Sequence, residues 1–215
     1  MSATSTPFFN AHHSPIGAFA SLTLGQPGCK GGFGLEREGP ANEDVFVAVQ
    51  DLDAHDFHAL PFFAGADSTD AARYDVEGAS GSMAAGAPDH AKNEKRQPVI
   101  RAFALDSVQR DFGLCRDTWR AGDLAFTIYT QLVAIPDPAT AANADTAALR
   151  DALVPAVWAE LTIDNRAGRK PRRGFFGNAG KDPDSRMRTW GADDFVAAGQ
   201  GGHIGIFARA EPGVQ

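Results

Sequence analysis

The sequence predicts an all-β protein with the architecture of an antiparallel β-sandwich, and three observations lead to this prediction. Several segments alternate apolar and polar residues with a period of two, the pattern of a strand with one buried face. Clusters of Gly, Pro, Asn and Asp separate these segments, as turns do in sandwiches. Only one short segment favours helix. With 215 residues, 43% of them hydrophobic and 22% charged, the chain is long enough to bury a core.

Six segments are predicted to be strands because they alternate or are rich in β-branched and aromatic residues: 16–24, 44–50, 124–135, 157–164, 172–180 and 204–208. The turn residues Asn165 to Gly168 lie between two of these segments and favour a hairpin of 157–164 with 172–180. A short helix is predicted from about Asp145 to Leu153, where Asp145 or Thr146 can act as the N-cap and Pro155 follows.

The chain is predicted to form a single sandwich domain over residues 1–215. Residues 65–98 differ from the rest because they are rich in Ala, Gly, Ser and Asp and contain few residues that could form a core. We expect a long, mobile loop there.

Charge and composition exclude some classes of partner. A net charge of −7 argues against nucleic acid. No segment approaches the roughly 18 apolar residues that span a bilayer, and residues 1–15 do not have the pattern of a secretory signal. Cys29 and Cys115 are expected to be free thiols in a reducing compartment. We therefore expect a cytoplasmic protein without a membrane partner, and the sequence predicts no cofactor.

A polar cluster of Asn10, His12 and His13 directly precedes the first predicted strand. Amide and imidazole groups donate and accept hydrogen bonds in fixed directions, which suits the hydroxyls of a sugar, and we predict that these residues bind substrate. The alternative is that both histidines only satisfy backbone groups. Adjacent residues of an extended chain point to opposite faces, so both can face one ligand only if the chain bends.

Three further groups of residues favour structural interpretations. The segment Asp51 to His58 contains oxygen and imidazole groups typical of a metal site, but no second ligand cluster is evident, so a polar loop is predicted instead. The basic residues between Arg166 and Arg173 are interpreted as the solvated tip of a hairpin. Of the pair Phe175 and Phe176, one ring is expected in the core and the other against a neighbouring element.

Catalytic carboxylates cannot be assigned from spacing. Two neighbouring carboxyl groups can act as a general acid and a general base, but such pairs usually meet only through the fold. Acidic residues are numerous, but none is marked as half of a pair by its position: they include Glu36, Glu38, Glu43, Asp44 and Glu160. No catalytic residue is therefore predicted in this chain.

Several long motifs, in one order, resemble the glycoside hydrolase family 52 β-xylosidases. The first runs from Phe8 to Gly25 and is followed by Gly31 to Glu36. Residues 117–129 read D-T-W-R-A-G-D-L-A-F-T-I-Y, close to the family's D-T-W-K-A-G-D-L-x-F-T-I-Y. Further matches lie at 152–157, 161–165 and 172–177. The resemblance runs from about Pro7 to the end of the chain.

The resemblance implies an intracellular, retaining xylan 1,4-β-xylosidase that releases xylose from short xylo-oligosaccharides during xylan breakdown. It implies an N-terminal β-sandwich followed by an (α/α)₆ barrel that carries the catalytic glutamate and aspartate, neither of which maps to a position here. We therefore expect an N-terminal fragment whose sandwich continues beyond Gln215, and which is inactive alone. Unpaired strand edges would favour a homo-oligomer. The alternative is a non-catalytic module that binds carbohydrate or a barrel-bearing partner.

Overall fold

The computed structural model describes residues 11–13, 20–24, 30–35, 42–63, 67–68, 98–130, 134–137, 139, 146–178, 187–200 and 204–214. It divides into two compact units, residues 1–178 and 179–215, and each is described by itself. Within the described residues no helix has the length and hydropathy needed to cross a membrane.

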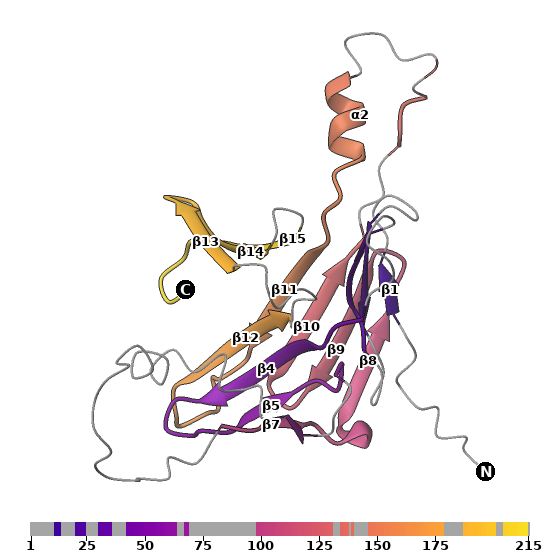
Figure 1. Cartoon of the computed structure of the whole chain (residues 1–215). Helices are drawn as coiled ribbons and strands as arrows, with labels where there is room; N and C mark the ends of the chain where they lie inside the picture. The colour runs from indigo at the N-terminus through magenta and orange to yellow at the C-terminus, as the bar shows by residue number, and fades with distance from the viewer. Residues whose placement is uncertain are drawn as a thin grey trace, which may run out of the picture. The chain divides into compact units, whose positions relative to one another are not determined.

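The first unit contains three sheets (Figure 1). The five-stranded sheet has the order β12-β4-β5-β7-β6, the four-stranded sheet β11-β10-β9-β8, and the small sheet β1-β2-β3. Their strands are β1 (Ala11–His13), β2 (Ala20–Leu24), β3 (Gly32–Leu35), β4 (Val45–Asp51), β5 (Phe57–Ala59), β6 (Asp67–Ser68), β7 (Ile100–Ala102), β8 (Val108–Phe112), β9 (Arg116–Ala121), β10 (Leu124–Tyr129), β11 (Trp158–Ile163) and β12 (Arg172–Asn178). A short 3₁₀-helix spans Leu105–Ser107, and α2 spans Thr146–Ala152.

The two larger sheets share one core, which makes this unit a sandwich. Strand β4 contributes Val45, Val47 and Val49, and the facing sheet contributes Trp119 and Phe126 among others. The ring of Phe176 in β12 stacks on that of Phe126 in β10, with centroids 5.9 Å apart. The small sheet adds Leu22 and Leu24 to the same core. The prediction of an all-β, sandwich-like fold is confirmed, with one exception to antiparallel pairing: β5 and β7 run parallel.

Strand β4 is buried on both faces, because its alternate residues lie in a second apolar layer. Phe46 contacts Phe63 at a centroid distance of 5.4 Å. On the same face, the ring of Phe175 meets Phe57 edge-on at 4.9 Å. The prediction for the Phe175–Phe176 pair is therefore confirmed, since Phe176 lies in the core of the sandwich and Phe175 packs against β5.

The predicted hairpin of 157–164 with 172–180 is wrong. Strand β11 pairs with β10 in the four-stranded sheet, whereas β12 pairs with β4 in the five-stranded sheet. The connection at 164–171 therefore crosses from one sheet to the other. Turn residues fix where a chain reverses, but not which neighbour each strand joins, and here both strands find earlier partners with complementary apolar faces.

The other predicted elements are found with shifted bounds. The helix at Thr146–Ala152, strand β4 and a strand at Ile204–Arg209 are confirmed. The strand predicted at 124–135 ends at Tyr129, and that predicted at 16–24 is described only from Ala20. Most of the loop predicted at 65–98 lies outside the described residues; Asp67–Ser68 pairs with β7. Among the described cysteines, Cys115 is a free and exposed thiol, whereas Cys29 lies outside the described part.

The second unit is one antiparallel sheet of β13 (Met187–Ala192), β14 (Phe195–Gln200) and β15 (Ile204–Arg209). Trp190 and Phe207 meet edge to face on it, with centroids 5.5 Å apart. Gly199 lies beneath the Trp190 indole, because a Cβ there would come within 2.6 Å of a ring carbon. The small residue thus lets the ring lie close to the strand.

Candidate functional site

The predicted substrate-binding residues lie at or before the first strand. His12 and His13 occupy successive positions of β1, where their backbones pair with Thr23 and Leu22 of β2. Asn10 lies outside the described residues. The sugar-binding role of Asn10, His12 and His13 stays a prediction.

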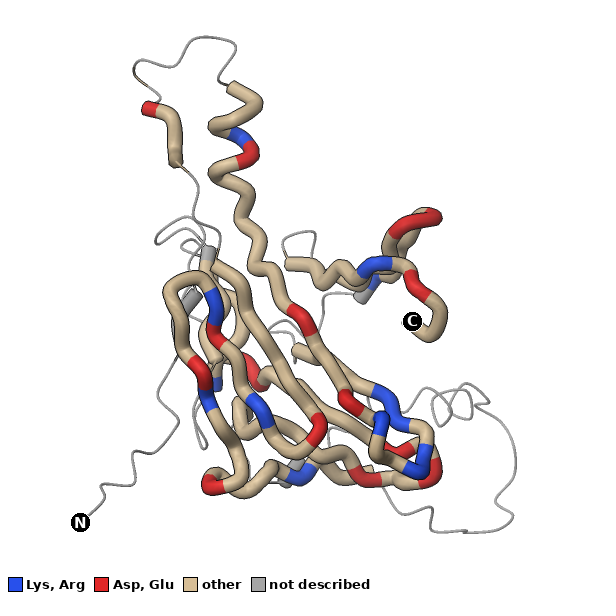
Figure 2. Tube along the Cα trace, turned by 180° about the vertical axis from the view of Figure 1, so that it is seen from behind, with Lys and Arg blue, Asp and Glu red and all other residues tan. Residues whose placement is uncertain are grey.

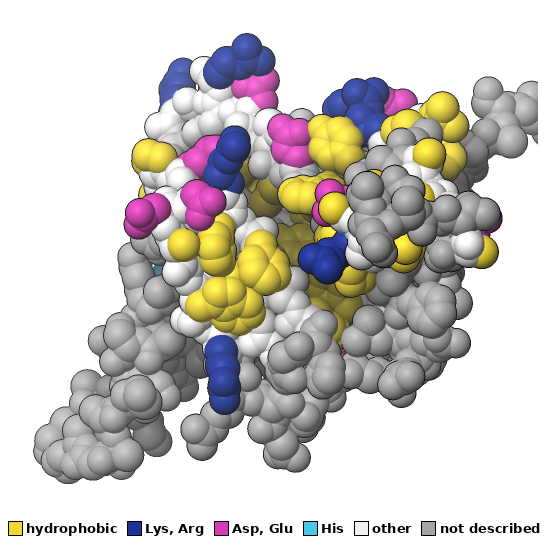
Figure 3. Space-filling model, turned by 90° about the horizontal axis from the view of Figure 1, so that it is seen from above, with side chains coloured by type: hydrophobic (Ala, Val, Ile, Leu, Met, Phe, Trp, Pro, Cys, Tyr) yellow, Lys and Arg dark blue, Asp and Glu magenta, His cyan; other side chains and the backbone are white. Residues whose placement is uncertain are grey.

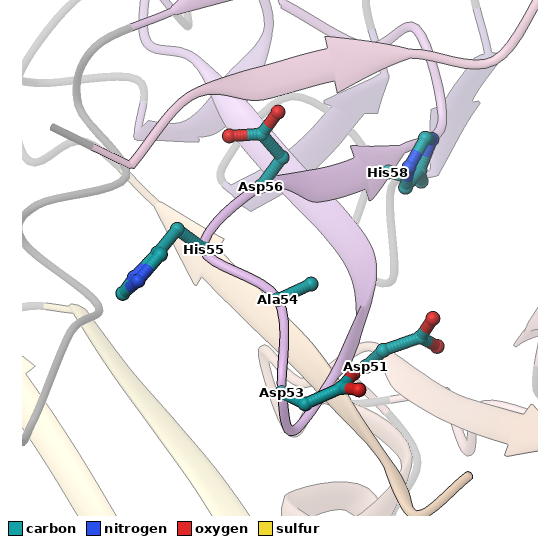
Figure 4. A pocket seen from close by; sticks show the side chains of 6 residues that line it. All are labelled: Asp51, Asp53, Ala54, His55, Asp56 and His58. Atoms are coloured by element: carbon teal, nitrogen blue, oxygen red, sulfur yellow. The ribbon is translucent and has the colours of Figure 1, made fainter. Parts of the chain in front are cut away.

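A shallow pocket of about 360 Å³ lies at the connection between β4 and β5. It is lined by Asp51, Asp53, Ala54, His55, Asp56 and His58, the segment that resembles a metal site in sequence. Figure 4 shows that these side chains do not converge, since His55 and His58 point to opposite sides of the loop. Within the described part of the chain, no three His, Cys, Asp or Glu side chains are grouped so that they could hold a metal ion.

The acidic side chains of this loop are paired with basic ones from distant segments. Asp53 pairs with Lys170 at 2.7 Å, and Asp56 pairs with Arg101 of β7 at 3.1 Å. Arg172 of β12 bonds both Asp51, at 2.7 Å, and Asp123 in the β9–β10 turn. In Figure 2, acidic residues (red) and basic residues (blue) lie next to one another at this end of the sandwich. The acidic loop and the basic run, which look independent in sequence, neutralise each other.

Two hydrogen bonds from Gln50 hold the loop from inside. Its side-chain nitrogen donates to the carbonyl oxygens of Ala54, at 3.0 Å, and His55, at 3.4 Å. Its side-chain oxygen accepts a hydrogen bond from the Arg173 side chain, at 2.9 Å. Gln50 is buried, so these bonds satisfy a polar group that would otherwise destabilise the core.

The ion pairs also hold these groups in their charged forms. The hydrogen bond from Lys170 lowers the pKa of Asp53, and the same bond raises the pKa of Lys170. Hydrogen bonding to Asp123, followed by its charge and that of Asp51, raises the pKa of Arg172. Groups held charged in this way are poor general acids or bases near neutral pH. The carboxylates of the loop therefore serve in ion pairs that stabilise it, and its interpretation as a polar loop stays a prediction.

A second polar group lies on the outer face of the four-stranded sheet. The Tyr129 hydroxyl donates to Glu160 at 2.7 Å, and the Thr162 hydroxyl donates to the other Glu160 oxygen at 3.3 Å. Glu160 raises the pKa of Tyr129, mainly through this hydrogen bond. Trp158, whose side chain is exposed, precedes Glu160 by two residues on β11 and lies directly opposite Tyr129 of β10. Sequence alternation places Tyr129 on the outer face, but the pairing that brings Trp158 and Glu160 beside it follows only from the fold.

Two carboxylates are buried in the described part of the sandwich, Glu43 and Asp117. Asp117 accepts two hydrogen bonds from Arg110, so it is held by an ion pair. Glu43 lies outside the strands, where its backbone forms a bridge with Gly31. Neither carboxylate is assigned a catalytic role.

The chain matches the family model of glycosyl hydrolase family 52 over residues 22–215. Two relatives, both named beta-xylosidase and both from Geobacillus stearothermophilus, are 43% identical over 209 residues and 40% identical over 210 residues. These alignments cover 95% and 94% of this chain, but only 27% and 32% of the relatives. The chain thus spans less than a third of the length of these relatives. A family match over most of its residues shows that the chain belongs to glycosyl hydrolase family 52.

Proposed function

We propose that this chain is the β-sandwich part of a β-xylosidase that acts in the cytoplasm on short xylo-oligosaccharides from xylan. The observation that carries this proposal is the identity of 43% to a beta-xylosidase over 95% of the chain. Because the chain spans less than a third of these relatives, the catalytic carboxyl groups are proposed to lie in the part of the enzyme that it does not match. The sandwich would then position a separate catalytic part rather than carry the chemistry.

The reaction is proposed to proceed with retention of configuration. A chimera provides the test: residues 1–215 replace the matching segment of the beta-xylosidase that is 43% identical. p-Nitrophenyl β-xyloside is added, so that each turnover releases a single xylose, and its anomeric proton is followed by NMR before mutarotation. The proposal predicts that β-xylose appears first, because two inversions restore the configuration. Release of α-xylose first would contradict it.

Asn10, His12 and His13 are proposed to contact the sugar in the complete enzyme. Loss of a buried hydrogen bond to substrate lowers binding by about 1–3 kcal/mol, which corresponds to about ten- to a hundredfold in kcat/KM. His12→Ala or His13→Ala in the chimera should reduce kcat/KM by that factor while the melting temperature stays the same. If both variants keep the parental kcat/KM, the histidines serve the backbone only.

A second candidate function is that of a non-catalytic module binding carbohydrate. The observation that favours it is the exposed pair of Trp158 and Tyr129 on a sheet face that also carries hydrogen-bonding groups. The two candidates are separable, because the first is tested by hydrolysis in the chimera and the second by sugar binding to residues 1–215 alone.

A further inference from the structure

The outer face of the four-stranded sheet forms a regular grid across β9, β10 and β11. In one row, Arg116, Tyr129 and Trp158 lie directly opposite one another. In the next row, Thr127 lies between Thr118 and Glu160. Neighbouring strands are separated by about 4.8 Å, and rows on one face by about 6.8 Å. We call Tyr129, Trp158, Glu160, Thr162 and Thr127 the β10–β11 platform.

The platform combines exposed aromatic rings with ordered oxygen atoms. The side chain of Trp158 is 64% exposed and that of Tyr129 is 41% exposed. Glu160 is exposed between Tyr129 and Thr162 and accepts a hydrogen bond from each. Carboxylate oxygens have about four acceptor sites, so Glu160 can still accept hydrogen bonds from a ligand. The hydroxyl oxygens of Tyr129 and Thr162 also keep lone pairs.

Packing beneath β10 fixes the strand that carries Tyr129 and Thr127. On the opposite face of β10, Leu124, Phe126 and Ile128 are almost completely buried. Thr127 is joined to Thr118 of β9 through hydroxyl oxygens 3.0 Å apart. A site built on paired strands holds its geometry better than one built on a loop. The protein therefore loses little conformational entropy when a ligand binds there.

The composition of the platform favours a saccharide over a protein partner. Only two of its five side chains present large apolar surfaces, whereas protein interfaces bury a contiguous, well-packed apolar centre. On the side of the molecule viewed in Figure 3, several hydrophobic side chains gather at the surface, with charged side chains around them. A sugar ring has apolar C–H faces that pack on an aromatic ring, and hydroxyls around its edge that need directed donors and acceptors.

We propose that the β10–β11 platform is a non-catalytic binding site for a neutral β-linked oligosaccharide of xylose. One sugar ring stacks on the Trp158 indole, and its hydroxyls donate to Glu160. This inference rests on the proposed function for the choice of xylose, because the platform chemistry alone defines only a neutral sugar. It places a contact for xylo-oligosaccharides on the sandwich.

The test titrates residues 1–215 with xylohexaose by calorimetry and compares Trp158→Ala and Glu160→Gln with Trp190→Ala. Trp190 is a matched control because it is also exposed, at 43%, but belongs to the second unit. Loss of one stacked ring should weaken binding about tenfold. We expect that loss for Trp158→Ala, a smaller one for Glu160→Gln, and unchanged binding for Trp190→Ala.

Three outcomes would overturn the platform: no saturable binding by the parent chain, equal binding by Trp158→Ala, or an equal loss for Trp190→Ala. Glu160→Gln preserves side-chain shape, so it remains informative if Trp158→Ala does not fold. If Trp158→Ala dissociates a dimer and leaves xylohexaose binding unchanged, the platform is instead an interface between two copies of this chain. Hydrolysis by the chimera is a separate readout, so the platform and the proposed function can fail independently.

Discussion

Arg110 and Asp117 form a two-point ion pair inside the sandwich, between the neighbouring strands β8 and β9. The Arg110 Nε donates to one carboxylate oxygen at 2.8 Å, and a terminal nitrogen donates to the other at 2.5 Å. The side chains are only 5% and 2% exposed. The guanidinium also lies over the Trp119 ring, 4.9 Å from its centroid, so the pair is part of the packing around the largest core side chain.

Neutralising Asp117 should therefore be strongly destabilising. Asp117→Asn removes a buried carboxylate charge that accepts two hydrogen bonds from Arg110, and we expect a loss of about 3–5 kcal/mol in the free energy of unfolding. The matched control is Asp111→Asn, which breaks the Arg116–Asp111 pair on the same two strands at more than half exposure. Exposed pairs contribute about 0–1 kcal/mol. Urea unfolding gives the free energy of unfolding of both variants. Equal losses for Asp117→Asn and Asp111→Asn would contradict the claim that burial makes the first pair important.

Two glycines with positive φ should respond differently to Ala. Gly32, at φ 93°, and Gly122, at φ 59°, both adopt a backbone conformation unfavourable for L-residues. A Cβ on Gly32 would lie 2.7 Å from the Glu43 Cβ, whereas one on Gly122 would meet nothing within 4 Å. Gly122→Ala should cost about 1–2 kcal/mol of stability. Gly32→Ala should cost about 1–3 kcal/mol more, because it adds overpacking.

The comparison is made by thermal unfolding of the two variants side by side. Gly122→Asn serves as the control for backbone strain, since Asn tolerates this conformation better than Ala does. A Gly32→Ala variant as stable as Gly122→Ala would show that Glu43 moves aside freely.

Asp164 should titrate at unusually low pH. The hydrogen bonds and charge of Arg166 lower its pKa from 3.8 to about 2. A depressed folded-state pKa contributes stability that is fully present above about pH 4, the unfolded value, and is lost as the pH falls through about 2. NMR titration of the Asp164 carboxyl carbon measures this directly. Arg166→Ala should raise the midpoint toward 3.8 but not fully to it, because the backbone N–H of residue 166 still bonds Asp164, and a midpoint that stays near 2 would assign the shift to another group.

The alternation of residues was sufficient to predict which face of several strands lies inward. Leu124, Phe126 and Ile128 share a buried face because their period of two matches the pleat of β10. The helix at Thr146–Ala152 follows from its Ala-rich sequence. These features depend on residues close in sequence, and local physics determines them.

Strand partners could not be predicted, since they depend on distant segments. The hairpin of 157–164 with 172–180 fits the turn residues, but β12 instead pairs with β4, more than a hundred residues earlier. The same limit applies to the charged loop. Asp51 and Arg172 are 121 residues apart, and only the β4–β12 ladder brings them together. The platform of Tyr129 and Trp158 likewise exists only once β10 and β11 are paired.

Hydrolysis of p-nitrophenyl β-xyloside by the chimera tests the central claim most directly. The rate is compared with those of the parent beta-xylosidase, of the parent lacking the exchanged segment, and of residues 1–215 alone. The account predicts turnover by the chimera well above that of the deletion, and none by residues 1–215. A chimera that melts cooperatively but hydrolyses no faster than the deletion would contradict a β-xylosidase sandwich, as would genuine turnover by residues 1–215 after removal of host enzymes.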